Sequence, residues 1–207
     1  GEGPFISLDV LEKNDVECFG AANGNLRLNG LGGTAPYRFY VNGQVSNQEW
    51  ITDLIPGNYS VYTEDANACL SEIEVIAIEQ PDLLQASAST KAVRCFEESN
   101  GAATITVAGG TGAYRYRWNN NLETATSTAL NAGNYSVTIT DANACSTTVN
   151  FTVNSPDPLS TLFASEDNLC HDDESGWINI RSTSGGTSPY RYFFADQLWP
   201  NSSETIS

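Results

Sequence analysis

The sequence predicts an all-β fold in which immunoglobulin-like β-sandwich modules of about 76 residues follow one another end to end. Three observations favour this fold class: a segment that is written three times, short runs in which apolar and polar residues alternate, and a glycine–tyrosine pattern that opens a late strand. No segment shows a convincing helical period of apolar residues.

The repeated segment contains two glycines, a threonine and a tyrosine. Its copies are Gly32–Tyr40, Gly109–Trp118 and Gly185–Phe193. The tyrosines that follow the glycines lie 77 and then 76 positions apart, which indicates a structural repeat. In each copy we expect the glycines to turn the chain into a strand and the alternate aromatic residues of that strand to face the core.

The repeat predicts three domains. The first repeat occupies residues 1–80, the second residues 81–155, and an incomplete third residues 156–207. Proline-containing segments at 80–82 and 155–158 predict short, stiff joints. Because the third repeat stops before its last two strands, we expect the chain to continue beyond Ser207 or a partner to complete the sheet.

Within the first repeat, alternation predicts the strands in chain order. Phe5–Val10 alternates apolar and polar residues, and Leu26 and Leu28 do so in a second strand. A third strand follows the glycines, the Asn42-Gly43 pair predicts a tight turn, and a weaker strand is expected near 49–52. The second repeat shows a similar order of signals.

A late strand of each repeat opens on a glycine with a tyrosine two positions later, in Leu54–Val61 and Leu130–Val137. This pattern resembles the tyrosine corner of Greek-key sandwiches, in which the tyrosine hydroxyl, here of Tyr59 or Tyr135, bonds back to the preceding corner. Each strand ends in the same turn, Asp-Ala-Asn-Ala-Cys, whose copies lie at 65–69 and 141–145.

The chain has 207 residues and a formal net charge of −16, with only two lysines. Such a surface repels nucleic-acid phosphates and anionic lipid, so we predict no nucleic-acid partner and no direct membrane insertion. No apolar run reaches the roughly 18 residues of a membrane helix. Five cysteines in small modules favour an oxidising, extracytoplasmic location. The start, without methionine or signal peptide, suggests part of a longer secreted protein.

Taken together, these motifs resemble the SprB repeat. The shared pattern is a cysteine, Asn-Gly, a short strand, Gly-Gly-Thr-x-Pro-Tyr-x-Tyr, Gly-Asn-Tyr-Ser-Val, Asp-Ala-Asn-x-Cys and a closing proline. That family occurs in very long cell-surface adhesins of Bacteroidota, including the gliding-motility adhesin exported by the type IX secretion system. The resemblance implies an extracellular location, an attachment or stalk function and no catalysis, and it supplies no ligand-binding residues. One departure is that Ala68 and Ala144 stand where the family usually has glycine.

Four cysteines are candidates for disulfide bonds: Cys18, Cys69, Cys95 and Cys145. Sequence order favours intramodule pairs, Cys18 with Cys69 and Cys95 with Cys145, each closing about 50 residues. Free thiols are one alternative, and the other pairs Cys18 with Cys145 across the first joint, leaving Cys69 for a preceding module. Geometry raises an objection to the favoured pairs, because their cysteines are expected at opposite ends of a strand of roughly 23 Å, whereas bridged Cα atoms lie within about 7 Å.

Three arginines occupy one equivalent position, directly after the repeated tyrosine: Arg38, Arg115 and Arg191. Each is expected to point away from the core. One interpretation is pairing with a cross-strand acid or packing of the stem on the sheet. The functional interpretation is a regular stripe that contacts anionic or sugar ligands. The predicted partners of the chain are a surface polysaccharide or another cell-surface protein, and further repeats of the same chain.

The aromatic residues of the repeated strand are predicted to fill the core: Tyr37, Phe39, Tyr114, Tyr116, Trp118, Tyr190, Tyr192 and Phe194. Three further tryptophans are not placed by the pattern: Trp50, Trp177 and Trp199. An exposed tryptophan among them would favour carbohydrate stacking. No cofactor is predicted. Asp65 and Asp141 are weak calcium candidates, since one carboxylate per turn is too few and such side chains also stabilise turns by themselves.

No catalytic residue is predicted, because the single histidine, His171, lies in a polar run with nothing that places it beside a nucleophile. The sequence therefore predicts a non-catalytic repeat region of a secreted cell-surface adhesin, acting in gliding motility or attachment as a stiff stalk and multivalent contact surface. An inert spacer, or carbohydrate-binding accessory modules of a secreted glycan-degrading enzyme, are the alternatives.

Overall fold

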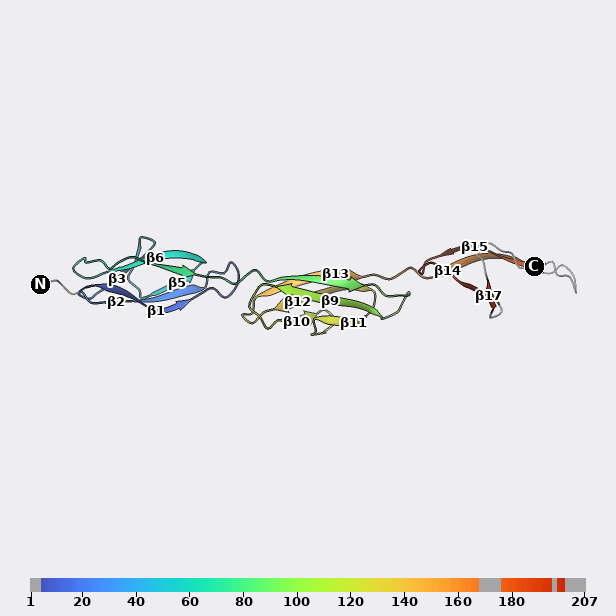
Figure 1. The fold of residues 1–207 in the computed structure, drawn as a ribbon, viewed down its shortest axis with the longest axis horizontal. Helices are drawn as coiled ribbons and strands as arrows, with labels where there is room; N and C mark the ends of the chain where they lie inside the picture. Colours follow the sequence, from blue (N-terminus) through green and yellow to red (C-terminus); the bar gives the residue numbers. More distant parts are fainter. Residues whose placement is uncertain (1–4, 168–175, 195–196, 200–207) are drawn as a thin grey trace. The chain divides into compact units, whose positions relative to one another are not determined.

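The computed structural model describes residues 5–167, 176–194 and 197–199, and every helix or strand assigned among them is a β-strand (Figure 1). The strand pairs with a defined register are antiparallel. The predicted fold class, an all-β chain of tandem β-sandwich modules, is confirmed.

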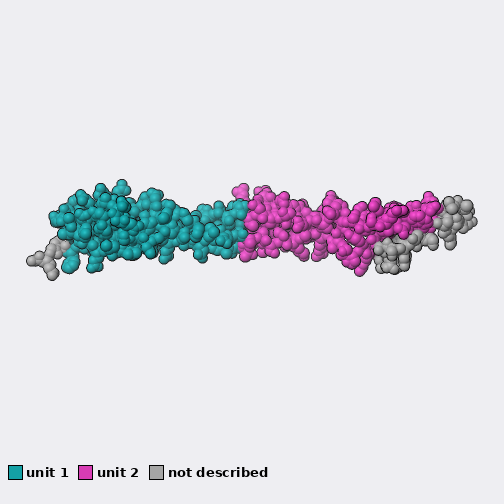
Figure 2. Space-filling model, turned by 90° about the horizontal axis from the view of Figure 1, so that it is seen from above, with its two compact units in different colours: residues 1–86, 107–116, 138–148 teal, residues 87–106, 117–137, 149–207 magenta. Residues whose placement is uncertain are grey.

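The chain divides into two compact units, each described on its own below (Figure 2). Unit 1 comprises residues 1–86, 107–116 and 138–148, and unit 2 comprises residues 87–106, 117–137 and 149–207. The first repeat lies in unit 1, whereas residues of the second repeat belong to both units. The repeat boundaries expected from the sequence stay a prediction.

The first repeat contains seven strands in two sheets. They are β1 (Ser7–Asn14), β2 (Gly24–Leu31), β3 (Arg38–Val41), β4 (Gln44–Ser46), β5 (Trp50–Leu54), β6 (Gly57–Glu64) and β7 (Glu74–Ile78). One sheet has the order β1-β2-β5 and the other the order β4-β3-β6-β7. The chain therefore crosses between the sheets after β2, after β4 and after β5, as in immunoglobulin-like sandwiches.

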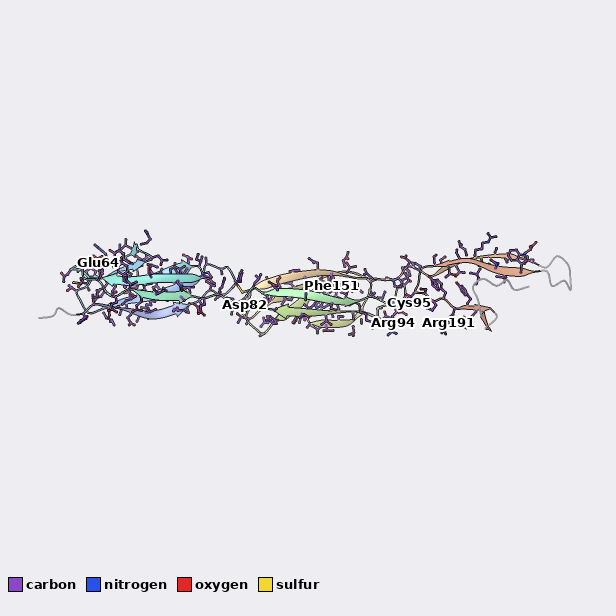
Figure 3. The ribbon with its side chains drawn as sticks, turned by 45° about the horizontal axis from the view of Figure 1, so that its top comes forward. Glu64, Asp82, Arg94, Cys95, Phe151 and Arg191 are labelled. Carbon is purple, nitrogen blue, oxygen red and sulfur yellow. A yellow bond between two sulfur atoms is a disulfide. The ribbon has the colours of Figure 1, made fainter. Side chains whose placement is uncertain are left out.

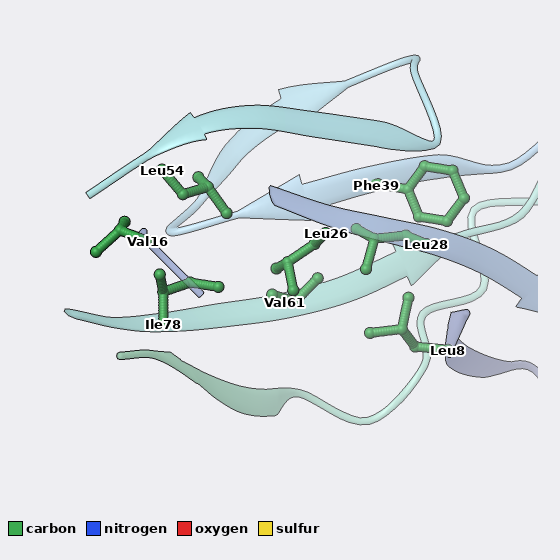
Figure 4. Packing of buried hydrophobic residues seen from close by; sticks show 8 residues of the cluster. All are labelled: Leu8, Val16, Leu26, Leu28, Phe39, Leu54, Val61 and Ile78. Carbon is green, nitrogen blue, oxygen red and sulfur yellow. The ribbon is translucent and has the colours of Figure 1, made fainter. Parts of the chain in front are cut away.

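The core of the first repeat lies between these two sheets. In β2 every second residue is buried, so Leu26 and Leu28 face inward, and Val61 of β6 packs in the same cluster. The other buried members are Leu8, Val16, Phe39, Leu54 and Ile78 (Figure 4). Full burial of one such side chain stabilises the fold by about 1.5–3 kcal/mol, so this cluster supplies a large share of the stability of so small a module.

A tight turn joins β3 to β4. Asn42 and Gly43 both have positive φ, 49° and 77°, which is the geometry that two-residue hairpin turns require. The Asn42 side-chain oxygen also accepts a hydrogen bond of 2.9 Å from the Ser60 amide on β6. The weak strand expected near 49–52 is β5, and β4 is a short strand that the pattern did not indicate.

The second repeat has the same order of sheet partners. Its strands are β8 (Gln85–Lys91), β9 (Gly101–Ala108), β10 (Arg115–Trp118), β11 (Thr126–Leu130), β12 (Gly133–Thr140) and β13 (Ser146–Val153). The sheets have the orders β11-β9-β8 and β10-β12-β13. Within unit 2 the buried apolar residues of this repeat are Val93, Ala103, Ile105, Trp118, Leu130, Val137 and Val153.

The described part of the third repeat consists of two strand pairs in unit 2. They join β14 (Ser160–Glu166) to β15 (Trp177–Ser184), and β16 (Tyr192–Phe194) to β17 (Gln197–Trp199). Leu162 and Phe163 of β14 are exposed. The expected continuation of the sandwich beyond Ser207 stays a prediction.

Candidate functional site

The two best-copied motifs of the sequence meet in space. Asp65 accepts three backbone hydrogen bonds of 2.9 Å: one to Oδ2 from Thr34, in the Gly-Gly-Thr loop, and two to Oδ1 from Asn67 and Cys69, in its own turn. These bonds, with that from Cys69 the largest contributor, hold the pKa of the Asp65 carboxyl below its ordinary value. We call this element, residues 32–34 with 65–69, the glycine–aspartate junction.

The second repeat contains the same junction, formed by residues 109–111 with 141–145. Asp141 accepts from the backbone amides of Thr111, Asn143 and Cys145 at 2.9, 3.0 and 2.9 Å. Only 5% of Asp65 and 4% of Asp141 is exposed. Both carboxylates are therefore engaged with backbone amides, which is the structural role that the sequence left open beside calcium binding.

The second glycine of the motif makes room for this carboxylate. A Cβ atom on Gly33 would lie 2.7 Å from Asp65 Oδ2, and one on Gly110 would lie 2.8 Å from Asp141 Oδ2. Both glycines also have positive φ, 57° and 66°. Only glycine combines this backbone conformation with so close an approach.

The first glycine of the motif makes room for the chain that enters the module. A Cβ atom on Gly32 would lie 1.9 Å from the Phe5 carbonyl oxygen, and one on Gly109 would lie 2.1 Å from that of Leu83. In the third repeat, a Cβ atom on Gly185 would lie 2.0 Å from the Pro158 carbonyl oxygen. The Gly-Gly pair is thus more than the turn that the sequence predicted, because it also seats the segment that leads into each repeat.

The repeated tyrosine closes the same loop. Its hydroxyl donates to the carbonyl of the first glycine, five residues earlier, in each repeat: Tyr37 to Gly32 at 2.5 Å, Tyr114 to Gly109 at 2.7 Å and Tyr190 to Gly185 at 2.6 Å. This hydrogen bond accounts for the constant spacing between glycine and tyrosine. A second tyrosine hydroxyl donates to the backbone carbonyl four residues earlier, from Tyr59 to Ile55 at 2.8 Å and from Tyr135 to Asn131 at 3.1 Å. This hydrogen bond defines a tyrosine corner.

The alanine before the second cysteine has a left-handed backbone. Its φ is 63° at Ala68 and 64° at Ala144. A residue with a Cβ atom is less stable in this conformation than glycine, by roughly 1–2 kcal/mol. The departure from the family pattern noted in the sequence therefore leaves the turn intact, since its hydrogen bonds are made, and strains its backbone.

The junction of the second repeat also holds a loop of the first. Cys18 and Cys145 form a disulfide bond, with Cα atoms 5.7 Å apart and 127 positions apart in sequence. Beside it, the Asn143 side-chain amide donates to the Glu17 carbonyl at 3.0 Å. A hollow of about 190 Å³ adjoins the disulfide, with Phe19 and Pro81 among its lining residues. All of these residues belong to unit 1, and we call this set of contacts the joint clasp.

The favoured intramodule disulfide pairing is wrong. Cys18 pairs with Cys145, and both Cys69 and Cys95 are free and exposed. The reason is the length of β1. Cys18 follows the end of β1, whereas Cys69 belongs to the junction that seats Phe5 before its start, and eight residues of strand span about 27 Å. A disulfide bridges Cα atoms within about 7 Å, so the two cysteines of one repeat cannot meet.

The family model described as SprB repeat matches residues 11–45 and 87–122. Each matched segment contains a first-cysteine loop, a Gly-Gly-Thr loop and the strand between them. The chain carries SprB repeats. The family expected from the motifs is thereby confirmed.

Among solved structures, 14 chains match. One is a β-glucuronidase from glycoside hydrolase family 2, with a TM-score of 0.27 and 10% identity, and the match covers 85% of this chain and 29% of that one. Another contains domains 4–9 of the surface layer protein SbsC, with a TM-score of 0.30, 12% identity and coverage of 93% and 42%. The chain thus spans less than half the length of either. No curated protein matches the sequence.

The repeated arginines are exposed on the SprB repeats, at Arg38, Arg115 and Arg191. Glu64 lies opposite Arg38 in the sheet register, but it accepts a hydrogen bond of 2.5 Å from the Tyr40 hydroxyl, which raises the pKa of that tyrosine. Among the described residues the one ion pair joins Lys13 to Asp15, at 3.1 Å. The cross-strand pairing considered for Arg38 is therefore not formed, and ligand contact by the three arginines stays a prediction.

The aromatic residues of the repeated strand are buried or half-buried where their side chains are described, and the side chain of Phe194 lies outside that part. Phe39 and Trp118 are buried most deeply. Trp118 packs edge-on against Tyr135 and Phe151, with ring centroids 6.2 and 5.6 Å away (Phe151 is labelled in Figure 3).

The three unplaced tryptophans differ from one another. Trp50 is 42% exposed, and the Arg27 guanidinium lies 5.6 Å from the centre of its ring. Trp177 is half-buried and donates to Glu166 at 2.8 Å. The side chain of Trp199 lies outside the described part. A cation therefore already lies over one face of the Trp50 ring, which leaves less of that ring for a sugar.

Within the described residues, no group of three or more His, Cys, Asp or Glu side chains is arranged to hold a metal ion. His171 and Cys170 lie outside those residues. Among the same residues, no helix is long and apolar enough to cross a membrane.

Proposed function

We propose that this chain is a non-catalytic repeat region of a secreted cell-surface adhesin, serving as a stalk and as a multivalent contact surface. The SprB family match supports a cell-surface repeat region of the adhesin type. The disulfide supports an oxidising, extracellular location. A role in gliding motility and export by the type IX system, which the family resemblance implies, belong to the same proposal.

The observation that carries the stalk function is the joint clasp. A disulfide between positions 18 and 145 bypasses the chain between them. When the chain is pulled from its ends, those 127 positions cannot extend, and roughly 400 Å of fully extended chain stays shielded from force. The Asn143–Glu17 hydrogen bond adds a noncovalent contact beside the disulfide. Such a joint suits a segment that carries tension between a cell and a surface.

The contact surface consists of the repeated arginines. They are exposed at one equivalent position in an otherwise acidic chain, and their regular recurrence suits a polymeric partner with repeated anionic or hydroxyl groups. A surface polysaccharide fits this description better than a compact protein. Many weak contacts of this kind add up through avidity.

The location is tested with antibodies against the chain on intact source cells. The proposal predicts labelling without permeabilisation, and labelling only after lysis would contradict it. The contact surface is tested by binding of the intact chain to immobilised acidic and neutral polysaccharides. Replacing Arg38, Arg115 and Arg191 together with Gln is expected to abolish binding, whereas Arg117→Gln, an exposed arginine outside the repeated position, is expected to change it little. Equal loss in both variants would contradict the role of the stripe, and no binding to any polysaccharide would favour a spacer.

A further inference from the structure

Each half of the joint clasp occurs a second time in the chain without a partner. Cys95 stands 77 positions after Cys18, and Cys69 stands 76 positions before Cys145. Both Cys69 and Cys95 are exposed free thiols (Cys95 is labelled in Figure 3). Among the described residues, the chain thus presents one first-cysteine loop and one turn of the kind that binds it, each without a disulfide partner.

The unused loop has the conformation of the loop in the clasp. The Glu98 amide donates to the Cys95 carbonyl at 3.2 Å, and the Arg94 amide donates to the Asn100 side chain at 2.9 Å. The corresponding two bonds in the loop of Cys18 measure 3.0 and 3.2 Å. The aromatic residue after the cysteine is 47% exposed at Phe96 and 51% exposed at Phe19. The loop is therefore formed before it has a partner.

The unused turn is also formed. Asp65 makes the same three backbone contacts as its counterpart in the second repeat. The Asn67 amide donates to the Thr34 hydroxyl at 3.0 Å, as Asn143 donates to that of Thr111 at 3.2 Å. Asn143 also donates to a loop carbonyl, and the described residues offer Asn67 no such second acceptor. The turn of the first repeat therefore lacks only the loop.

The recognition does not depend on the side chain before the cysteine. Asn143 contacts the backbone carbonyl of Glu17, so the arginine that replaces this glutamate at position 94 presents the same acceptor. A loop of this conformation therefore presents the same backbone acceptor to such a turn whichever side chain precedes its cysteine. The geometry fixes only the order, with the first cysteine of one repeat meeting the second cysteine of the next.

We propose that Cys69 and Cys95 are the unpaired halves of two further clasps, whose partner in each case is another SprB repeat. Cys95 bonds to the cysteine of an Asp-Ala-Asn-x-Cys turn in a following repeat, and Cys69 bonds to the cysteine loop of a preceding one. Each bond joins two thiols and transfers two electrons and two protons to a disulfide oxidant such as oxidised glutathione, which becomes two thiols. The inference goes beyond the stalk function, since it holds whether or not the repeats bind a ligand.

The test gives Cys69 its missing neighbour while keeping the chain whole. A second copy of residues 5–82 is placed directly before Phe5, which preserves the spacing of the joint, and the protein is equilibrated with glutathione. Disulfide mapping without reductant is expected to show Cys18 of the added copy bonded to Cys69 of the original repeat, next to the Cys18–Cys145 bond. In the matched Cys69→Ser variant the added Cys18 is expected to stay a thiol.

The Cys18–Cys145 bond in the same molecules reports that the sample is oxidised and folded, and resistance to limited proteolysis reports that the added repeat is folded. With both present, a Cys18–Cys69 bond inside the added copy, or two thiols at these positions, would overturn the proposal. If the added repeat is not resistant, a copy of residues 83–157 in its place makes the same test through Cys95.

Discussion

The turns at Asp65–Cys69 and Asp141–Cys145 are the same structure in two situations. Their internal hydrogen bonds agree, yet only the second turn binds a loop and a disulfide partner. The motif itself therefore forms the turn, and the neighbouring repeat adds the clasp without reshaping it. The repeated motif therefore reflects what each module needs to fold, whereas the clasp at a turn depends on the repeat that precedes it.

The largest expected effect is the difference in stability between serine variants of the two cysteines of the first repeat. Cys18→Ser removes a cross-link over 127 positions and is expected to lower the free energy of unfolding by about 3 kcal/mol. Cys69→Ser removes an exposed free thiol and is expected to change it by less than about 0.5 kcal/mol. Urea unfolding without reductant measures both, and equal effects would contradict the assignment of the clasp.

A smaller effect is expected inside the junction of the second repeat. Gly110→Ala places a Cβ atom 2.8 Å from Asp141 Oδ2 at a φ of 66°, and is expected to destabilise the chain by about 2 kcal/mol. Gly112→Ala, two residues later, is the control, because a Cβ atom there has nothing within 4 Å. Thermal unfolding compares the two variants, and a neutral Gly110→Ala would remove the reason given for the second glycine.

An opposite effect is expected at the strained alanine. Ala144→Gly relieves a left-handed backbone and is expected to stabilise the turn by up to about 1 kcal/mol, reduced by the greater freedom of glycine in the unfolded chain. Ala68→Gly is expected to do the same in the first repeat, whereas Ala142→Gly, at a position without positive φ, is not expected to stabilise. Chemical denaturation of all three checks whether the departure from the family glycine strains both turns equally.

The smallest effect expected is one of pH. Because the folded pKa of Asp65 is lowered from its ordinary 3.8, its contribution to stability is complete above that value and is lost as the pH falls below it. The pKa of Asp15, whose carboxylate accepts a hydrogen bond from the Glu79 amide, is also lowered, so this group changes stability with the same sign. The difference in unfolding free energy between wild type and Asp65→Asn therefore measures the contribution of Asp65. The unfolding free energies of both proteins are measured between pH 6 and about 2.5. If the two free energies change in parallel with pH, the electrostatic role of Asp65 in the junction is contradicted.

The sequence predicts the fold well because strand alternation and turn chemistry are local. Leu26 and Leu28 alternate with polar residues and are buried as expected, and Asn42-Gly43 is the tight turn. The family also follows from motif order. These features need no knowledge of which distant segments meet.

The clasp and the junction depend on distant contacts, which explains what the sequence missed. Sequence order favoured Cys18 with Cys69, although the expected strand length already argued against that pair, and the alternative Cys18–Cys145 bond is the one that forms. Nothing local shows that Gly32 seats the Phe5 carbonyl or that Asp65 binds Thr34. The signal available was the joint repetition of Gly-Gly-Thr and Asp-Ala-Asn, which occur together in the first and second repeats.

Peptide mapping of the 207-residue chain, purified and digested without reductant, tests the central claim most directly. Free thiols are blocked before digestion, so that each cysteine is recovered either in a bonded peptide or as a labelled thiol. The structure predicts one Cys18–Cys145 peptide, with Cys69 and Cys95 labelled. A Cys18–Cys69 or Cys95–Cys145 peptide as the main product would show that the clasp across the joint does not form.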